Sequence, residues 1–282
     1  MSNDQPDIGL TVVILTFNEE KNILPCIESV RPLTQEIVII DSFSTDSTLD
    51  ILKQQKVEFV QNRFINYSEQ RNFALREAGI KSDWVFMLDA DERLSPNLAL
   101  EIKTLLASNP KENGFQIRRR FYWYGRWIKR GYYPVWLTRL VRREKAYCET
   151  RIVNEHLQVE GDLGTLREDI IHEDQNGIDR WHMKHLRYAE LEAIIFFSEK
   201  KEIKTFKRWL QHRIWDKLPL FFRPWVYFVY RYFLRGGFLD GWQGLSFHFF
   251  QSLWLQFLIS FKIKEFKKSG VYGTNSDSLL KN

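Results

Sequence analysis

Two aspartates that directly follow an apolar run are the residues of this sequence best suited to chemistry. Residues 84–88 are Trp-Val-Phe-Met-Leu, the pattern of a buried strand, and Asp89 and Asp91 follow with one residue between them. In an extended chain this spacing directs both carboxylates to one face, where they repel unless a cation lies between them. Mg²⁺ or Mn²⁺ suits this position because either ion binds carboxylate oxygens and completes its shell with waters and phosphate oxygens. The plain alternative is a polar loop, since Asp-x-Asp alone is common.

The elements that must hold these aspartates are the strands and helices of the N-terminal part of the chain. Four runs rich in apolar residues have the length of buried strands: 10–16, 36–41, 57–61 and 84–88. A helical pattern follows each run after a short link. This alternation predicts an α/β fold with a mostly parallel sheet flanked by helices. Such sheets bind ligands beyond the carboxyl ends of their strands.

Two of these helices have clear start signals. Ser68 is expected to cap a helix that runs to about Gly79. Ser95 and Pro96 are expected to be the cap and first residue of a helix that runs to about Ala107. The first of these two helices would point at the edge of the sheet at which the aspartates lie.

Further polar residues are expected at the same edge. Asp41 ends the second strand, so its carboxylate could accept a hydrogen bond from an imide N–H or a ribose hydroxyl, or it could belong to the cap of the next helix. Arg71 lies near a helix start that points to this edge, where it would meet a phosphate or remain a solvated arginine. Neither common glycine-rich phosphate loop occurs, neither G-x-G-x-x-G after the first strand nor G-x-x-x-x-G-K-S/T. These features together predict a nucleotide diphosphate held by a metal and side chains.

The composition narrows the class of protein. A chain of 282 residues allows one large domain, or one domain with an appendage. The net charge of +5 is modest, so the distribution of charge matters more than its sum. Cys26 and Cys148 form no C-x-x-C pair and no disulfide framework, which fits a reducing cytosolic compartment. The polar, acidic N-terminus does not have the pattern of a signal peptide.

The C-terminal part is basic and aromatic. Lys and Arg are interleaved with aromatic residues over 200–235, which is typical of a surface attracted to anionic lipid. Residues 242–261 carry no formal charge, but their Gln, Ser and His side chains favour a helix lying in the membrane interface over one crossing it. The alternatives are a helical hairpin packed on the catalytic domain or a dimer interface. No RNA-binding motif is present, so nucleic acid is not an expected partner.

Four motifs resemble, in order and spacing, the family 2 glycosyltransferases of the GT-A fold. They are Thr16-Phe17-Asn18-Glu19-Glu20, Asp41-Ser42-Phe43-Ser44-Thr45-Asp46, Gln70-Arg71-Asn72 and Leu88-Asp89-Ala90-Asp91-Glu92. Later motifs look like the bacterial lipopolysaccharide-core glucosyltransferase-like branch. They are Gly125-Arg126-Trp127-Ile128, Gly131-Tyr132-Tyr133-Pro134, Arg139-Leu140, Val153-Asn154-Glu155, Leu186-Arg187-Tyr188-Ala189 and Gly237-Phe238-Leu239-Asp240-Gly241. The resemblance covers about 9–268.

The resemblance implies a role for each matching residue. Thr16, Asn18 and Glu19 with Asp41 would hold the nucleoside, usually uridine. Arg71 would lie near the phosphates, where relatives usually have Lys. Asp89 would contact the ribose or the metal. The metal site, for Mg²⁺ or Mn²⁺, would consist of Asp91 and His172, and Glu155 would be the general base.

Two departures from the family pattern matter. Phe43 stands where relatives usually have glycine, which leaves the conformation of that loop open. Asn154 stands where relatives usually have histidine, although the neighbouring Glu155 remains. For Glu155 the plain alternative is a solvated glutamate in a turn. For His172 it is a structural histidine with its hydrogen bonds satisfied.

The activity implied is that of an inverting, metal-dependent glycosyltransferase. It would move a hexose from a nucleotide-sugar, most often UDP-linked, to a lipid-linked saccharide such as lipopolysaccharide core. One base and direct displacement invert the anomeric centre, and no second nucleophile for retention stands out. The protein would be peripheral or monotopic at an anionic membrane surface, on the cytoplasmic face of the inner membrane.

The expected organisation has three parts. A catalytic domain would span 1–177, with its nucleotide-binding half at about 9–110 and its acceptor half at about 111–177. A basic aromatic region that associates with the membrane would span 178–269, and a disordered tail 270–282. Two other functions stay open. One is transfer to a polyprenyl phosphate, for which Glu155 would be dispensable. The other is an inactive membrane-bound scaffold, for which Asp91 would be dispensable.

Overall fold

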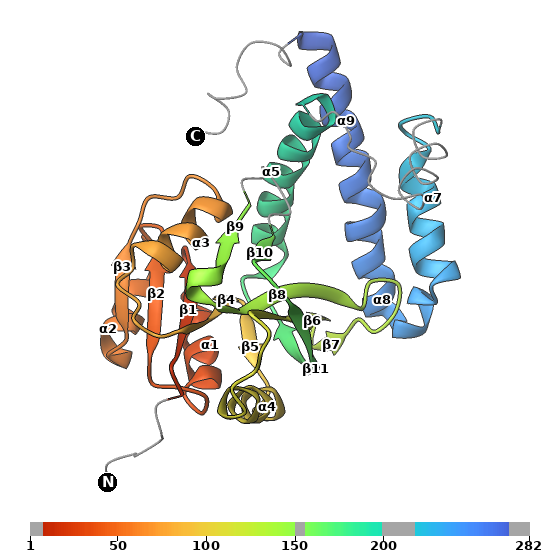
Figure 1. The fold of residues 1–282 in the computed structure, drawn as a ribbon. Helices are drawn as coiled ribbons and strands as arrows, with labels where there is room; N and C mark the ends of the chain where they lie inside the picture. Colours follow the sequence, from red (N-terminus) through yellow and green to blue (C-terminus); the bar gives the residue numbers. More distant parts are fainter. Residues whose placement is uncertain (1–7, 150–155, 199–217, 271–282) are drawn as a thin grey trace. The chain divides into compact units, whose positions relative to one another are not determined.

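The computed structural model describes residues 8–149, 156–198 and 218–270. The chain forms two compact units. The first comprises Met1–Gly125 and Pro134–Gly177, and the second Arg126–Tyr133 and Ile178–Asn282. The first unit is an α/β structure built on one large sheet, and the described part of the second is chiefly helical (Figure 1).

The N-terminal half of the sheet is parallel. Its strands, in spatial order, are β3 (Glu58–Gln61), β2 (Ile37–Asp41), β1 (Leu10–Thr16) and β4 (Trp84–Asp89). The helices of this region are α1 (Ile23–Val30), α2 (Thr48–Gln55), α3 (Tyr67–Arg76) and α4 (Pro96–Ala107). Strand and helix thus alternate in the order expected from the sequence, which confirms the predicted fold class.

The second half of the sheet is mixed. Beyond β4 follow β8 (Val135–Arg142), β6 (Gly114–Trp123), β11 (Leu163–His172) and β5 (Glu92–Leu94). β8 runs antiparallel to β4 and β6, whereas β11 runs parallel to β6. A separate two-stranded sheet pairs β9 (Ala146–Cys148) with β10 (Leu157–Val159). The short β5 pairs antiparallel with the end of β11, and this contact brings His172 to the site.

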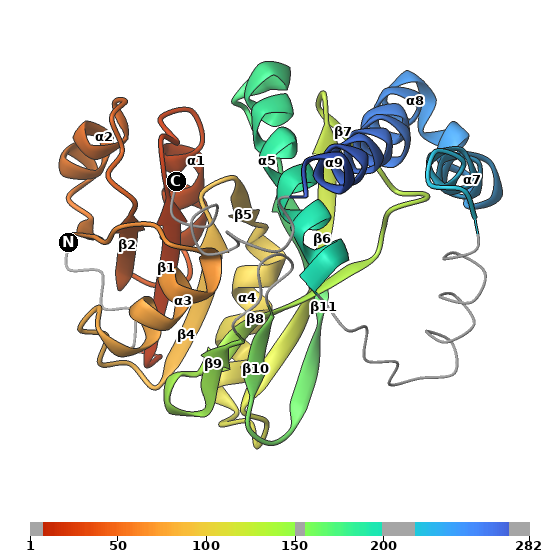
Figure 2. The ribbon, with the colours of Figure 1, turned by 90° about the horizontal axis from the view of Figure 1, so that it is seen from above.

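Both faces of the parallel strands are buried. Val12, Ile14 and Phe86 pack on the side of α1, while Val13 and Met87 pack on the side of α3. Figure 2 shows these helices on opposite faces of the sheet. Because the side chains of a strand alternate between faces, a strand covered on both sides is mostly apolar. This is why residues 10–16 are apolar at every position except Thr11 and Thr16.

The structure confirms one predicted helix start and corrects the other. Ser95 caps α4, since its hydroxyl accepts a hydrogen bond from the Leu98 N–H at 3.1 Å. The cap of α3 is Asn66 and not Ser68, because the Asn66 side chain accepts from the Glu69 N–H at 2.8 Å. Ser68 instead lies buried in the first turn of α3, where its hydroxyl donates to the Glu149 carbonyl.

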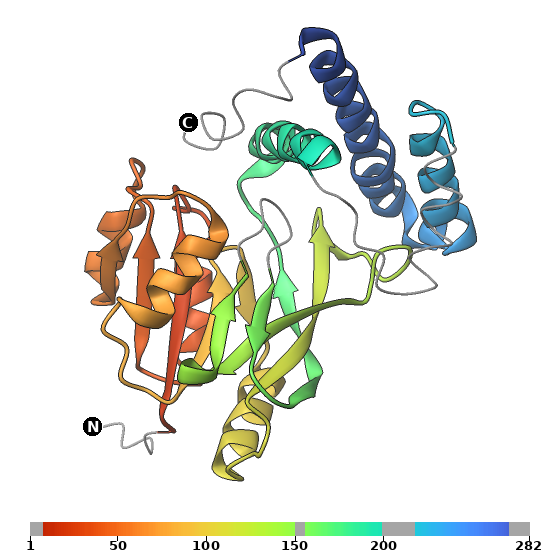
Figure 3. The same ribbon diagram turned by 45° about the horizontal axis from the view of Figure 1, so that its top comes forward.

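The second unit contains a helical hairpin. α5 spans Gly177–Ser198. The first arm of the hairpin is α7 (Arg223–Val229), which continues as a π-helical turn (Tyr230–Leu234). A 3-10 turn (Gly237–Asp240) joins it to α8 (Gly241–His248), a π-helical stretch (Phe249–Trp254) and α9 (Leu255–Ser269), and Figure 3 shows α7 beside α9. None of the described helices combines the length and the apolar character needed to cross a membrane.

Candidate active site

Three strands of the parallel sheet end at the same level. Thr16 is paired with Asp41, and Leu15 with Asp89. Thr16 is buried, and its hydroxyl oxygen has no hydrogen-bond partner within the described residues. A buried polar atom without a partner is costly unless a ligand satisfies it. The carboxyl edge of the sheet therefore presents one unsatisfied hydroxyl beside two carboxylates.

Asp41 organises the loop that follows its strand. Its carboxylate accepts from the Ser44 hydroxyl at 2.5 Å, the Ser44 N–H at 3.0 Å and the Gln61 amide at 3.0 Å. Asn18 joins the first loop to this one, because its backbone N–H donates to the Ser44 hydroxyl and its side-chain oxygen accepts from the Thr45 N–H. The two motifs recognised in the sequence thus form one hydrogen-bonded unit.

The loop keeps a conformation that usually requires glycine. Phe43 has a φ of +62°, in the left-handed region, and its side chain is half exposed. A side chain other than glycine in this region costs about 1–2 kcal/mol. The sequence did not decide the conformation of this loop. In the structure, Phe43 adopts the left-handed backbone, and its ring projects from the loop.

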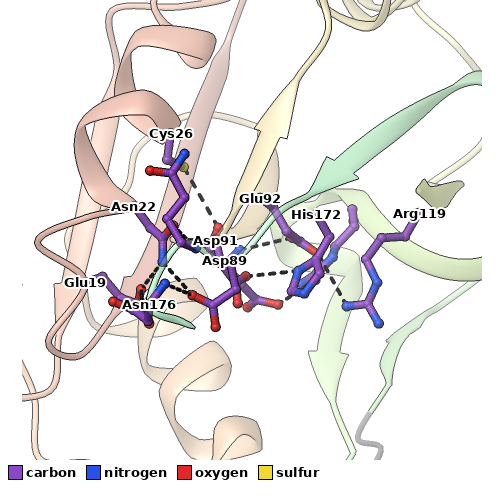
Figure 4. Close-up of polar contacts among 12 residues, drawn as sticks. Glu19, Asn22, Cys26, Asp89, Asp91, Glu92, Arg119, His172 and Asn176 are labelled. Atoms are coloured by element: carbon purple, nitrogen blue, oxygen red, sulfur yellow. Dashed lines mark hydrogen bonds and ion pairs between the residues drawn. The ribbon is translucent and has the colours of Figure 1, made fainter. Parts of the chain in front are cut away.

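Glu19 belongs to a network that reaches the end of β11. Its carboxylate accepts from the side-chain amides of Asn22 at 2.7 Å and Asn176 at 2.8 Å (Figure 4). Asn22, which is fully buried, also donates to Asp174 at 2.9 Å. Neither asparagine was singled out from the sequence, because nothing in their local pattern distinguishes them from ordinary loop residues. They fasten the first loop to the segment that follows His172.

Asp89 lies between two arginines. Its Oδ1 is 3.1 Å from Arg71 Nη2, and its Oδ2 is 2.7 Å from Arg139 Nη2. Burial raises the pKa of Asp89, but the charges of Arg139 and Arg71 outweigh burial and hold the pKa well below the ordinary value. Asp89 is therefore a firmly ionised carboxylate whose charge is already compensated.

Arg139 extends this compensation to a second carboxylate. The same guanidinium nitrogen lies 2.8 Å from Glu92, which is fully buried and also accepts from the Asp89 N–H at 3.1 Å. Burial lowers the pKa of Arg139, but the negative charges of Asp89 and Glu92 outweigh burial and raise this pKa above the ordinary value. The sequence offered one signal for this role, namely an arginine inside a strand that is mostly apolar. A buried cation there requires a buried anion.

Asp91 does not share a strand face with Asp89. β4 ends at Asp89, and Asp91 lies in the turn before β5, so the argument from an extended chain was wrong in its geometry. Instead, Asp91 Oδ1 lies 3.2 Å from Nδ1 of His172, and both side chains are largely buried (Figure 4). The Glu173 N–H donates to the Asp91 carbonyl at 3.0 Å, which fixes this turn to the end of β11.

Carboxylate oxygen and imidazole nitrogen are both metal ligands. Two neighbouring ligands of an octahedral ion, each at about 2.1 Å, lie about 3 Å apart. The Asp91–His172 distance of 3.2 Å suits that geometry. No group of three or more His, Cys, Asp or Glu side chains that could hold a metal gathers in the described parts of the chain. The pair alone would thus leave most positions of a cation to water or ligand oxygens.

Glu155 lies outside the described residues. The segment before it is anchored to α3, since the Asn72 side-chain amide donates to the Cys148 carbonyl at 2.9 Å and its oxygen accepts from the Cys148 N–H at 2.7 Å. Ser68 holds the Glu149 carbonyl in the same way at 2.6 Å. Three hydrogen bonds therefore fix the chain just ahead of the predicted base.

The chain is similar in sequence to known proteins. The sequence profile described as Glycosyl transferase family 2 matches residues 11–159. The chain is 30% identical to the lipopolysaccharide core biosynthesis glycosyltransferase LpsC of Rhizobium meliloti (strain 1021) over 263 residues, covering 86% of this chain and 90% of that protein.

Two solved structures are similar at lower identity. The structure of S. aureus TarS 1-349 is 13% identical, with a TM-score of 0.47 and coverage of 93% of this chain and 91% of that one. Glucosyl-3-phosphoglycerate synthase from Mycobacterium tuberculosis, in complex with Mn²⁺ and UDP-glucose, is 21% identical with a TM-score of 0.34, covering 40% of this chain and 43% of that one.

Proposed function

Because this chain belongs to glycosyltransferase family 2, we propose that it is an inverting, metal-dependent transferase that moves a hexose from a UDP-linked sugar to a lipid-linked saccharide. One observation carries the proposal: the paired strands β1, β2 and β4 end at the same edge of the sheet. Polar side chains at these strand ends lie near the Asp91–His172 pair. The lipopolysaccharide-core acceptor is supported by the name of the relative in Rhizobium meliloti.

The nucleoside would lie over the loop unit of Thr16, Asn18 and Asp41. The buried hydroxyl of Thr16 would gain a hydrogen-bond partner there. Asp41 is held in place by Ser44 and Gln61, so its carboxylate is preorganised to accept further hydrogen bonds from uracil or ribose. Glu19 would fix the position of this loop through its two asparagine contacts and face the same ligand.

The diphosphate would lie near Arg71 and the Asp91–His172 pair. Asp91 and His172 would hold Mg²⁺ or Mn²⁺, and the ion would supply charge neutralisation for the leaving diphosphate. Asp89 is already paired with two arginines, which supports a role in positioning Arg71 and in contact with the ribose more than direct ligation of the metal. Arg71 would thereby offer its remaining donors to a phosphate.

Glu155 would act as the general base. It would take the proton from the acceptor hydroxyl, whose oxygen forms a bond to the anomeric carbon while the bond from that carbon to the phosphate oxygen breaks. Glu155→Gln should lower the turnover number by about 10²–10⁴-fold while UDP binding is kept. A variant with the full rate would instead indicate an acceptor that is already ionised, such as a polyprenyl phosphate.

An enzyme that acts on a lipid-linked acceptor must reach a membrane surface. We place the enzyme on the cytoplasmic face of the inner membrane, attached peripherally. The basic and aromatic character of the C-terminal part supports this location.

The proposal is tested by calorimetric titration of the purified protein with UDP, GDP and CDP, each with and without Mn²⁺. We expect one nucleotide to bind more tightly with Mn²⁺. Asp91→Ala should abolish that difference, because it removes a ligand of the ion. Asp50→Ala is the matched control, since Asp50 is an exposed acid on α2 whose carboxylate pairs with Lys53 of the same helix. Absence of nucleotide binding in folded protein would reject the transferase activity.

A further inference from the structure

The helical hairpin of the second unit exposes a cluster of large apolar side chains at the end where its arms meet. We call Leu234, Phe238, Leu239, Trp242 and Leu245 the apolar tip. Leu234 is 75% exposed and Trp242 60%, and the other three are each about half exposed. Figure 1 shows α8, which carries part of the tip, at the junction of the two arms. Single exposed apolar residues are ordinary, but a contiguous group marks a surface that contacts something other than water.

The spacing of exposed residues along α8 shows that one helix face is involved. Trp242, Leu245 and Phe249 lie three and then four residues apart along α8 and the turn that continues it, and all three are exposed. On the opposite face of α8, Phe247 and His248 are buried. A helix that packs one face in the protein normally turns a polar face to solvent. α8 turns Trp242 and Leu245 to solvent instead, so its outer face is suited to a second apolar environment.

A basic loop is fastened beside the tip. In the 126–133 segment the Arg130 N–H donates to Asp240 at 2.8 Å, and the Arg130 carbonyl lies 3.2 Å from His248 Nε2. Arg231 donates to the carbonyl of Gly131. Gly131 has a φ of +74°, and a Cβ there would lie 2.5 Å from the His248 ring, so the approach requires glycine. The loop therefore holds a fixed place next to α8.

The exposed charged side chains of the 126–133 loop and of the chain around the apolar tip are positive. Arg126, Lys129, Arg130 and Arg235 are exposed. Asp240 is the only acid in residues 126–133 and 218–250, and it is buried, with its carboxylate accepting from the backbone N–H of Arg130. An apolar, tryptophan-containing face with cations beside it matches the interface of an anionic bilayer, where aromatic side chains and lysine or arginine are both favoured.

We propose that the apolar tip inserts into the headgroup region of an anionic membrane while the 126–133 loop contacts the lipid phosphates. The tip would enter to the depth at which interfacial helices lie, about 5–10 Å, without crossing the bilayer. This inference deepens the proposed function and rests on it for the lipid-linked acceptor. Lipid binding itself follows from the exposed residues and their charge.

Vesicle flotation of the full chain tests the proposal. We expect binding to vesicles of phosphatidylcholine with phosphatidylglycerol, and weaker binding to phosphatidylcholine alone. The double variant Trp242→Ser and Leu245→Ser should reduce binding to the anionic vesicles at least about tenfold, because it removes two inserted side chains. Leu100→Ser is the control, since Leu100 is 65% exposed on α4 in the first unit.

The cations are tested separately. Arg126→Gln with Lys129→Gln should weaken binding to the anionic vesicles and leave binding to phosphatidylcholine alone unchanged. Lys111→Gln, at another exposed lysine, should change neither. Equal binding of the loop variant and the unaltered chain to anionic vesicles would overturn the role of the loop.

A third measurement does not depend on how the serine variants fold. Brominated lipids should quench part of the tryptophan fluorescence of the full chain, and Trp242→Phe should remove much of that quenching. Unchanged quenching in Trp242→Phe, no binding to any vesicle, or a dimer in solution that the serine variants dissociate would each overturn the proposal. Titration with UDP in the absence of vesicles tests nucleotide binding, on which the proposed function depends, independently of the membrane, so the two failures can be told apart.

Discussion

Asp91 and His172 face each other at the edge of the sheet, with Oδ1 of the aspartate 3.2 Å from Nδ1 of the histidine. The turn after β4 supplies the first residue and the last position of β11 supplies the second. The ring of Phe121 packs on the imidazole, with ring centres 4.2 Å apart, and limits its orientation. This pair is the place at which we propose that a divalent ion binds.

Replacement of His172 should separate metal binding from nucleotide binding. If the imidazole is a ligand, His172→Ala should weaken Mn²⁺ binding to the UDP complex by about 10–100-fold, the loss typical when a group that holds or orients a metal is removed. Titration followed by the electron paramagnetic resonance of free Mn²⁺ gives this affinity. UDP binding without metal serves as the internal control and should be unchanged. Unaltered Mn²⁺ affinity would make His172 a structural residue.

Loss of Arg139 should destabilise the fold. Arg139→Met leaves the charges of Asp89 and Glu92 without their shared cation, and breaking such a buried pair costs about 3–5 kcal/mol in free energy of unfolding. Urea unfolding measures the change. Arg167→Met, at an exposed arginine on β11, should change it by less than about 0.5 kcal/mol. If Arg139→Met is as stable as the control, the network does not hold the site together.

Phe43 provides a test of the loop beside Asp41. Phe43→Gly should be more stable than Phe43→Ala by about 1 kcal/mol, because alanine keeps the cost of the left-handed backbone and glycine does not. Thermal or urea unfolding of the two variants makes the comparison. Both variants remove the ring, so contact of the ring with the nucleotide would appear as an equal loss of UDP affinity in both. Equal stability of the two variants would argue against the positive φ.

Two buried histidines predict a pH dependence of the second unit. Burial lowers the pKa of His185 and of His248 to about 4 each. In the unfolded chain a histidine has a pKa of about 6.5, so the unfolded state binds more protons between these values. Stability should therefore fall as the pH is lowered from about 6.5 toward 4. NMR titration of the imidazole protons checks this, and a pKa near 6.5 for both histidines would contradict it.

Prediction from sequence succeeded where a feature depends on neighbours in the chain. The strand over 10–16 and the Ser95 cap are both found as predicted. Periodicity and capping involve residues a few positions apart, so their signals are local. The cap of α3 shows the limit, because Asn66 and Ser68 are both good capping residues. Asn66 is the cap because its backbone is extended. The Ser68 hydroxyl instead donates to the carbonyl of Glu149, which is distant in the sequence.

The sequence by itself determined the kind of site: carboxylates at strand ends, no glycine-rich phosphate loop, and the motif residues at the carboxyl edge of a parallel sheet. Only the tertiary structure decided their partners. It paired Asp89 with Arg71 and Arg139, set Asp91 against His172, and brought Asn22 and Asn176 to Glu19. Each of these contacts except Asn22 to Glu19 joins residues far apart in the chain. The physical reason is that an ion pair depends on distance in space, and sequence pattern records distance only along the chain.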